Sequence, residues 1–356
     1  MKKNVLCLFG GRSGEYKVSL RSAESVLKNI DREKYNVLTA GITRDGTWYL
    51  YSGGADDIVS DTWHTKSDNL RRILLDPSHS CGGFYIMDGG APTPLSVDVI
   101  FPVMHGQYSE DGTLQGMLSL AGVPYVGSGC GASADCMNKS VTKAVLSGYD
   151  VPMAKSIVLR ASDFESGTAA EKIEKFFGNY PVFIKPSSSG SSLGASRADD
   201  RAGLDRALAL AFGVDSTVLA EECIVGREVE IAALETAGGE IFFSCCGEID
   251  PGDGFYDYDT KYENDNASYF IPARISEKTY ARIKEVAGTV FSAVSCRGFA
   301  RIDFFVVGRG EDERVIFNEI NTLPGFTSIS MYPQLMEKSG IGYTELISRL
   351  IEGAGK

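Results

Sequence analysis

The fold class follows from FARIDFFVVGRGEDERVIFNEINTLPG, residues 299–325. Apolar and polar residues alternate over 299–307 and again over 313–320, and this alternation is typical of two strands. The GRGED segment that joins them is typical of a turn. We therefore predict an antiparallel hairpin whose turn is centred near Glu311.

Four polar side chains of this hairpin are predicted to share one face. With the turn at that position, Asp303 lies opposite Glu319 and Arg301 lies opposite Asn321. Opposed residues of antiparallel strands lie roughly 5 Å apart on the same face. Carboxylate and amide oxygens suit a hard cation such as Mg²⁺, which usually shares its coordination shell with phosphate. The alternative is a surface hairpin with an ordinary salt bridge to Arg301, which leaves Asn321 unexplained.

Composition restricts the classes of protein that this chain can represent. Its 356 residues suggest two or three domains, each able to bury a core. A net charge of −12 argues against a nucleic-acid or anionic-membrane partner. No apolar stretch approaches the length of a membrane span, and the first apolar run is too short for a signal peptide. The eight cysteines form no CxxC pair, so we expect reduced thiols and a cytoplasmic protein.

The first third of the chain begins as an α/β domain. An apolar strand at 4–9 leads into a glycine turn and then a helical pattern over 18–30. Before a domain boundary near residue 128, the sequence further predicts buried strands at 36–42 and 97–103, an edge hairpin at 46–51 and a variable loop over 53–94.

The rest of the chain predicts two further segments before and around the hairpin. The first has a helix around 133–148, strands at 181–186 and 218–224, a Ser/Gly-rich loop at 187–194 and a helix over 200–212. The second has strands at 228–234 and 241–249, a polar loop over 250–268, and helices at 276–295 and 343–352. Loops as long as the 250–268 loop are usually lids or binding loops, or are disordered, and its tyrosines and lysine favour a lid.

The segment after the 181–186 strand has features of a phosphate site. Lys185 ends the strand, Gly190 and Gly194 allow close approach of the backbone, and the serines add donors. The spacing is not that of a Walker A motif, and a flexible turn would look similar. Lys139 offers a second cation, with a solvated surface lysine as the alternative.

Acidic residues close the same region. Glu221, Glu222 and Glu228 lie at or near the end of a strand, where carboxylates can accept hydrogen bonds from a ribose hydroxyl or an adenine amino group. Solvated surface charges are the alternative interpretation.

Seven motifs together resemble the ATP-grasp superfamily and, within it, the D-alanine–D-alanine ligases. They are GGRSGEYKVS (10–19), HGQYSEDGTLQG (105–116), YVGSG (125–129), IKPSSSGSSLG (184–194), FYDYDTKY (255–262), RIDFF (301–305) and NEINTLPGFTSIS (318–330). The early segment GITRDGTWYLY also resembles the vancomycin-resistance ligases that add D-serine.

The resemblance implies three α/β domains with ATP between the last two. They are an N-terminal substrate-binding, parallel-sheet domain (1–128), a central ATP-grasp domain (129–224) and a C-terminal ATP-grasp domain with the lid and the Mg²⁺ site (225–356). It also implies two Mg²⁺ ions, for which Mn²⁺ can substitute, and a homodimer. The implied reaction phosphorylates one D-alanine with ATP and lets a second D-alanine attack the acyl phosphate, for cell-wall precursors.

The resemblance assigns roles around the first substrate. Glu15 resembles the residue that holds its ammonium group, and His105 resembles the one that steers its carboxylate. Ser191 resembles the serine that links Glu15 to the lid tyrosine, Tyr262. Lys261 would reach the γ-phosphate when the lid closes and excludes water. Without the resemblance, Glu15 could be an acid favoured by a helix dipole, and His105 a structural histidine.

The remaining assignments concern ATP, metal and the second substrate. Lys139 and Lys185 resemble phosphate ligands, and Glu221 and Glu228 resemble the adenine and ribose acceptors. The other expected ATP-binding residues are Ser191, Glu222, Ile224, Lys261 and Asn318. The residues that resemble the Mg²⁺ ligands are Asp303, Asn321 and a bridging Glu319. Those that resemble the oxyanion donors and the ligand of the second carboxylate are Arg301, the N–H of Gly325, and Ser330.

The second substrate is predicted from two residues. A lid tyrosine favours an amine acceptor, and Met331 provides an apolar wall that cannot hydrogen-bond a serine hydroxyl. Such a pocket discriminates by roughly 100-fold, so the hypothesis is two D-alanines with slow use of D-serine. The alternatives are a D-alanine–D-serine ligase, another ATP-grasp carboxylate–amine ligase, and a non-catalytic nucleotide-binding or regulatory protein.

Overall fold

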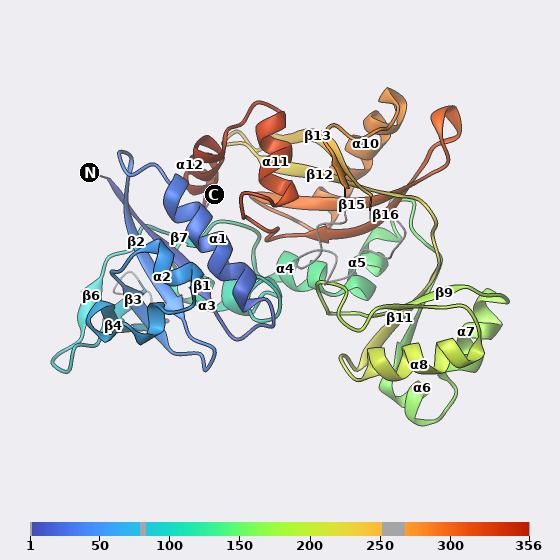
Figure 1. Cartoon of the computed structure of the whole chain (residues 1–356), viewed down its shortest axis with the longest axis horizontal. Coiled ribbons are helices and arrows are strands. Elements are labelled where there is room, and N and C mark those ends of the chain that lie inside the picture. The colour runs from blue at the N-terminus through green and yellow to red at the C-terminus, as the bar shows by residue number, and fades with distance from the viewer. Residues whose placement is uncertain (1, 79–82, 251–267, 356) are drawn as a thin grey trace.

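The computed structural model describes residues 2–78, 83–250 and 268–355 and arranges them around three β-sheets (Figure 1). The first sheet has the strand order β6-β5-β4-β3-β2-β1-β7. Its strands are β1 (Lys3–Gly10), β2 (Tyr35–Ile42), β3 (Trp48–Tyr51), β4 (Leu70–Leu75), β5 (Phe84–Ile86), β6 (Thr93–Leu95) and β7 (Val99–Pro102). β1 runs parallel to β2 and β7, which confirms the predicted parallel sheet, and the other neighbours are antiparallel.

Helices cover both faces of the parallel strands, which explains their continuous apolar sequence. Val5, Cys7 and Phe9 pack with α1 (Tyr16–Asn29) on one face. On the other face, Leu6 and Leu8 pack with α3 (Thr113–Ala121). The glycine turn after β1 therefore delivers the chain directly to the start of α1.

Two predictions for this region are wrong. Residues 53–94 are not a variable loop, because they contain β4, β5, the start of β6, α2 (Ala55–Val59) and the short 3₁₀ helices Trp63–Thr65 and Ser67–Asn69. The hairpin at 46–51 is not at an edge, because β4 pairs with the outer side of β3. These strands have three to six residues and are exposed at many positions, so their alternation is too short to detect.

The second sheet has four antiparallel strands in the order β10-β9-β11-β8. They are β8 (Ser156–Arg160), β9 (Val182–Pro186), β10 (Ser196–Ala198) and β11 (Thr217–Glu222). Its apolar residues pack on α7 (Ala169–Phe177) and α8 (Arg201–Phe212), with α6 (Ala161–Glu165) beside them at the lower right of Figure 1.

One predicted helix is two helices in the structure. The pattern over 133–148 forms α4 (Cys130–Met137) and α5 (Lys139–Leu146). The break is at Asn138, which is extended (φ −93°, ψ 97°) and whose side chain accepts from the N–H of Val141 as the N-cap of α5. Lys139 is therefore the first residue of a helix rather than an interior one.

The third sheet has five antiparallel strands in the order β14-β13-β12-β15-β16. They are β12 (Arg227–Glu235), β13 (Ile241–Asp250), β14 (Ser268–Phe270), β15 (Phe299–Val307) and β16 (Arg314–Asn321). α10 (Glu277–Ala293) packs on one face, and α11 (Met331–Lys338) on the other. α12 (Tyr343–Gly353) then packs against α1, so the end of the chain joins the first sheet to the third (Figure 1). The predicted 250–268 loop falls mostly on residues outside the described part.

The predicted register of the decisive hairpin is confirmed. Asp303 pairs with Glu319, and Arg301 pairs with Asn321. The turn contains a 3₁₀ helix at Gly310–Asp312. The ladder shifts by one residue next to Asp303, where Phe304 pairs with Phe317, so Asn318 is the extra residue of a β-bulge.

The described part of the chain offers no obvious membrane segment or disulfide. None of its helices combines the length and the apolar character that crossing a membrane requires. The cysteines of this part are all free thiols.

Candidate active site

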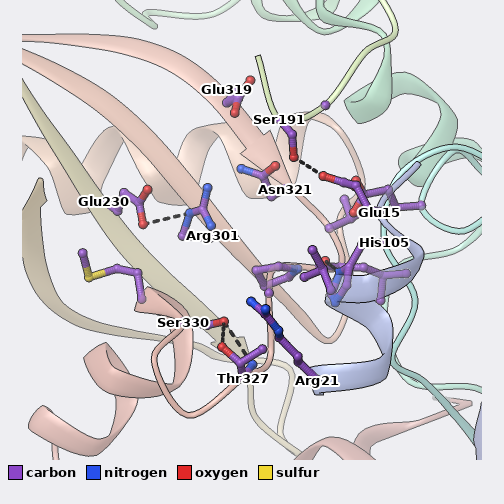
Figure 2. A pocket seen from close by; sticks show the side chains of 18 of the residues that line it. Glu15, Arg21, His105, Ser191, Glu230, Arg301, Glu319, Asn321, Thr327 and Ser330 are labelled. Atoms are coloured by element: carbon purple, nitrogen blue, oxygen red, sulfur yellow. Dashed lines mark hydrogen bonds and ion pairs between the residues drawn. The ribbon is translucent and has the colours of Figure 1, made fainter. Parts of the chain in front are cut away.

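A cavity of about 480 Å³ is lined by residues from separate parts of the chain. Its walls come from α1, the loop after β7, the Ser/Gly-rich loop after β9, the hairpin β15–β16 and the loop that precedes α11. Figure 2 shows their side chains pointing into this common space. Ten predicted site residues line it: Glu15, His105, Lys139, Ser191, Arg301, Glu319, Asn321, Gly325, Ser330 and Met331.

Glu15 lies just before α1 and is held from two sides. Its N–H donates to Ser13 Oγ (2.9 Å), and Ser13 donates to the carbonyl of His105 (2.6 Å). The hydroxyl of Ser191 donates to Glu15 Oε1. Ser191 has a φ of 49°, in the left-handed region that few residues other than glycine adopt. Such conformations are concentrated at functional sites, where the surrounding structure holds them.

His105 is buried, with 7% of its surface exposed, and both ring nitrogens are engaged. Nδ1 lies 3.2 Å from the carbonyl of Leu323, and Nε2 lies 2.9 Å from Ser22 Oγ. A carbonyl can only accept, so Nδ1 carries the proton and Nε2 accepts from the serine. Burial lowers the pKa of His105 although Glu15 opposes this, so the ring is neutral at neutral pH. As it stands, the ring ties α1 to the loop after β16, and one of these bonds must open before it can contact a carboxylate.

Glu110 is a further acid of this cavity that the sequence analysis did not select. The N–H of Gly106 donates to its Oε1 (3.1 Å). Burial, and then the charge of Glu15, raise the pKa of Glu110 to about 8. Its carboxyl group is therefore mostly protonated at neutral pH and does not add a second full negative charge beside Glu15.

Arg301 lines the cavity, and Asp303, which is buried and outside the lining, lies directly behind it. Arg301 donates from Nε to Asp303 Oδ1 (2.8 Å) and from Nη2 to Oδ2 (2.7 Å). Asn321 donates to the same Oδ2 (3.0 Å). Arg301 Nε also lies 2.9 Å from Oε2 of Glu230 on β12. Burial lowers the pKa of Arg301, but the carboxylates of Asp303 and Glu230 raise it more, so it stays well above its ordinary value.

The bulge in β16 turns two neighbouring side chains towards lysines. Glu319 Oε2 lies 3.4 Å from Lys139 Nζ, which also donates to the carbonyl of Ser189 (2.7 Å). Asn318 Oδ1 accepts from Lys185 Nζ (3.5 Å). In a regular strand, adjacent side chains would point to opposite faces. The bulge therefore explains how Asn318 and Glu319 both approach the lysines predicted to hold phosphate.

Glu221 lies at the centre of a buried ion cluster. Its two oxygens lie 2.7 Å from Lys185 Nζ and 2.6 Å from Lys143 Nζ. Burial raises the pKa of Glu221, but the two ammonium groups lower it more, and the net shift is downward. Glu221 is thus ionised and fixes Lys185 at the end of β9. Lys143, on α5, was not selected from the sequence.

The other predicted nucleotide residues lie outside the lining of the cavity. Glu222 is exposed and accepts from the N–H of Lys155 (2.8 Å). Ile224 is half-buried between β11 and β12, and Glu228 is half-buried at the start of β12. The lid residues Lys261 and Tyr262 lie outside the described residues.

The loop before α11 brings Gly325 and Ser330 together. A Cβ on Gly325 would lie 2.9 Å from Ser330 Oγ, so no larger residue fits there without movement. The N–H of Thr327 donates to Ser330 Oγ (3.0 Å), and Ser330 is the N-cap of α11. Met331 begins the helix and is buried against Gly247 of β13, where a Cβ would meet its sulfur at 2.6 Å.

Comparison with known proteins places this cavity in a family. Residues 4–128 match the family model described as D-ala D-ala ligase N-terminus, and residues 145–352 match D-ala D-ala ligase C-terminus. The chain is 42% identical over 352 residues to the D-alanine–D-alanine ligase of Caldicellulosiruptor bescii, covering 98% of this chain and 94% of that one. It is 43% identical over 358 residues to that of Clostridium novyi, covering 99% and 98%. The chain belongs to the D-alanine–D-alanine ligase family.

Solved structures of the D-alanine–D-alanine ligase family share the whole fold. The VanG D-Ala:D-Ser ligase from Enterococcus faecalis superposes with a TM-score of 0.89 at 38% identity, covering 99% of each chain. The D-alanine–D-alanine ligase from Coxiella burnetii gives 0.83 at 31% identity, covering 99% and 95%. The predicted ATP-grasp fold and the prediction of an enzyme rather than a regulatory nucleotide-binding protein are both confirmed.

The D-alanine–D-alanine ligase family is ATP-dependent, and the acidic patch suits the cation that accompanies ATP. Within residues 2–78, 83–250 and 268–355, no group of three or more His, Cys, Asp or Glu side chains is placed to hold a metal by itself. Asp303, Glu319 and Asn321 offer two carboxylates and one amide oxygen, which is an incomplete hard-cation shell. Such a donor set fits a cation that completes its shell with phosphate oxygens and water.

A detectable signal pointed to one of the site residues that were missed. Glu230 is an acid in the middle of an apolar strand, two residues after Glu228 and therefore on the same face. Neither Lys143 nor Glu110 carries a comparable signal, because Glu221, the partner of Lys143, and Glu15, whose charge acts on Glu110, both come from other segments.

Proposed function

We propose that this protein joins two D-alanine molecules into D-alanyl-D-alanine for peptidoglycan precursors, through a D-alanyl phosphate, while ATP becomes ADP and phosphate. The observation that carries the proposal is the single cavity in which Glu15, Arg301 and Ser330 face the same space. An amino acid needs a carboxylate for its ammonium group and cationic or N–H donors for its carboxylate. The cavity offers both, and Lys139 lines it as well, 3.4 Å from Glu319.

In the proposed first step, Glu15 holds the ammonium group of the first D-alanine, and Ser191 fixes the direction of the Glu15 carboxylate. The hydrogen bond between these two side chains and the bond from Ser13 to the backbone of His105 support this role. Lys139 and Lys185 neutralise the phosphates of ATP in this proposal. Ser191 and Asn318 lie near these two lysines and also contact ATP. Glu221, Glu222, Ile224 and Glu228 contact the adenine and ribose in this proposal.

Asp303, Glu319 and Asn321 would hold two Mg²⁺ ions, for which Mn²⁺ would substitute. Bound there, these ions would neutralise phosphoryl oxygens as charge moves between them. Lys139, 3.4 Å from Glu319, keeps the patch from being purely acidic before the nucleotide arrives.

In the proposed second step, the amine of the second D-alanine attacks the acyl phosphate. Arg301 and the N–H of Gly325 stabilise the oxyanion that develops, and Ser330 binds the carboxylate of the attacking molecule at the start of α11. Preorganised donors act strongly in a dry cavity because they need no reorganisation during the reaction. Lys261 and Tyr262 of the 250–268 segment complete the site as a lid in this proposal.

The proposal includes an organisation of the whole enzyme. Domains 1–128, 129–224 and 225–356 are supported by the three sheets, whose strands fall between residues 3–102, 156–222 and 227–321. A homodimer and a cytoplasmic location with no nucleic-acid or membrane partner complete it. Light scattering on the purified protein tests the dimer, and a monomeric mass at micromolar concentration contradicts it.

D-Serine is the second candidate acceptor, favoured by the high structural similarity to the VanG D-Ala:D-Ser ligase. Against it stands the buried, apolar Met331 beside Ser330, which offers no hydrogen bond to a serine hydroxyl. A site without such a partner rejects the hydroxyl by only roughly 100-fold, so we expect slow use of D-serine.

A product assay by mass spectrometry tests the proposal. Purified protein is incubated with ATP, Mg²⁺ and equal concentrations of D-alanine and D-serine near neutral pH. Mostly D-alanyl-D-alanine supports the proposed acceptor, whereas mostly D-alanyl-D-serine retains the chemistry and replaces the acceptor. No dipeptide of either kind from folded protein contradicts the function. The matched control is Asp303→Asn, which keeps the side-chain shape and is expected to abolish ADP formation.

A further inference from the structure

Glu230 is a buried acid beside the proposed reaction centre, with 6% of its surface exposed. It lies on β12 directly opposite Asp303 of β15, which in turn lies opposite Glu319 of β16. Three carboxylates therefore form a row across three neighbouring strands on one face of the sheet. Opposed residues lie roughly 5 Å apart, so this row is strongly repulsive without positive charge.

Two members of this row compete for the same N–H group. Arg301 Nε lies 2.8 Å from Asp303 Oδ1 and 2.9 Å from Glu230 Oε2. The Nε atom of arginine carries a single hydrogen, which cannot point straight at both oxygens. In this structure it donates to Asp303, and Figure 2 shows the carboxylate of Glu230 beside it. A small rotation of the guanidinium would transfer the bond to Glu230.

A cation on Asp303 changes this competition. Both Asp303 oxygens accept from Arg301, and Oδ2 also accepts from Asn321, so a cation that binds Oδ2 takes the place of one of its two donors and weakens the paired bonds to the guanidinium. Like charges at this distance repel, which drives Arg301 towards its other carboxylate. That carboxylate is Glu230, which is not among the proposed metal ligands.

We infer that Glu230 is a positioning residue that takes over the Nε–H of Arg301 when Asp303 binds a cation. With its Nε–H bonded to Glu230, Arg301 no longer competes with the cation for Asp303. The terminal nitrogens of Arg301 can then donate to the carboxylate of the substrate that reacts. This inference deepens the proposed function and rests on it for the identity of the reacting groups. Without Glu230, Arg301 stays on Asp303 and competes with the cation.

The test measures cation binding without turnover. Mn²⁺ is titrated into the full-length protein with ADP, and free Mn²⁺ is followed by its electron paramagnetic resonance signal. Groups that orient metal ligands typically alter metal affinity by about 10- to 100-fold, and we expect Glu230→Gln to weaken Mn²⁺ binding by that factor. The matched control is Glu235→Gln on the same strand. Glu235 also accepts from an arginine, Arg297 Nε (2.9 Å), but it lies outside the cavity lining. Glu235→Gln should leave Mn²⁺ binding unchanged.

A double-mutant cycle separates positioning from a simple loss of negative charge. In an Arg301→Met background, Asp303 no longer accepts from Arg301, so Glu230→Gln should weaken Mn²⁺ binding far less than in the unaltered protein. The same weakening in both backgrounds would mean that Glu230 acts only through its field and would overturn the inference. Unchanged Mn²⁺ binding in Glu230→Gln overturns it as well.

Two further measurements keep the outcome clear. If Glu230→Gln does not fold, Glu230→Asp keeps the charge, withdraws the carboxylate from Nε and should weaken Mn²⁺ binding to an intermediate extent. Dipeptide synthesis by the unaltered protein tests the proposed function separately. If Mn²⁺ binding depends on Glu230 but no dipeptide forms, the inference is retained and the proposed function is refuted. If dipeptide forms but Mn²⁺ binding does not depend on Glu230, the function is retained and the inference is refuted.

Discussion

The hydroxyl of Ser191 donates to the carboxylate of Glu15, across 176 residues of sequence. Ser191 belongs to the loop after β9 of the second sheet, whereas Glu15 precedes α1 beside the first. Gly190 lies against the same carboxylate, where a Cβ would be 3.7 Å from Oε1. The contact therefore links the loops of two sheets at the wall of the cavity and fixes the acid proposed to bind the first substrate.

Replacing Ser191 by alanine removes this contact. A hydrogen bond to a charged group is worth about 1.5–3 kcal/mol, which corresponds to roughly a 10- to 100-fold change. We expect Ser191→Ala to lower kcat/KM for D-alanine by that factor, measured by ADP release. Ser188→Ala, an exposed serine of the same loop, is the control and should behave as the unaltered protein. Equal effects of the two substitutions would contradict a specific role for Ser191.

Arg301→Lys tests the proposed oxyanion donor. Lysine keeps the positive charge but cannot make the two parallel bonds that Arg301 makes to Asp303. Loss of one oxyanion donor costs roughly 100- to 1,000-fold in rate, so kcat should fall by that factor with little change in KM for ATP. Steady-state ADP release checks both constants. A higher KM for ATP at unchanged kcat would assign Arg301 to nucleotide binding instead.

Glu110 makes a pH dependence testable in the ligand-free protein. Burial and the charge of Glu15 raise its pKa in the folded state from 4.5 to about 8. The folded state then binds more protons than the unfolded state between these values, so this contribution to stability is complete below 4.5 and lost as pH rises through about 8. Glu110→Gln removes the titration. Chemical unfolding from pH 4.5 to 9 should show the variant gaining stability relative to the unaltered protein as pH rises, and parallel profiles would refute the shift.

Asn138→Ala separates a stability effect from a site effect. The side chain of Asn138 caps α5 through the N–H of Val141 (3.2 Å). It also accepts from Ser187 Oγ (2.7 Å) in the Ser/Gly-rich loop after β9. We expect a loss of about 1 kcal/mol in the free energy of unfolding, as for other caps, and a higher KM for ATP. Asp200→Ala removes the equivalent cap of α8, which bonds to Gly203 N–H (2.7 Å) away from the cavity. Asp200→Ala should lower the free energy of unfolding by a similar amount without raising KM for ATP. An equal rise of KM for ATP in both variants would contradict a role for Asn138 at the site.

Met331→Arg tests the apolar wall beside the second substrate. A guanidinium there could hydrogen-bond a serine hydroxyl, and hydroxyl discrimination in apolar pockets is roughly 100-fold. We expect the ratio of D-alanyl-D-serine to D-alanyl-D-alanine to rise by at least about 10-fold in a mixed-substrate assay. Met331→Leu preserves volume and apolarity and should leave the ratio unchanged. An unchanged ratio in Met331→Arg would show that Met331 is not the determinant.

The sequence predicted the parts of the site that depend on local periodicity. The pairing of Asp303 with Glu319 and of Arg301 with Asn321 followed from alternation and one turn position, and the structure confirms it. The parallel core around β1 followed from a continuous apolar run, because strands buried on both faces have no polar side. Each of these signals is carried by residues that lie only a few positions apart in the sequence.

Features that depend on distant partners escaped this reasoning. Asn138 interrupts an apparently continuous helix because its side chain bonds to Ser187, which lies 49 residues later. The Asn318 bulge aims two neighbours at lysines of other segments, and Glu230 looks like an isolated charge until Arg301 is placed beside it.

By itself, then, the sequence determined the hairpin, the apolar strands and the types of side chain available for the chemistry, since periodicity of 2 or 3.6 residues is a property of the local backbone. Tertiary structure decided which charges meet. Glu15 with Ser191, Lys139 with Glu319 and Arg301 with Glu230 become neighbours only when the sheets and their loops pack together. Their charges act at separations of a few ångströms in space, and separation along the chain does not reveal such distances.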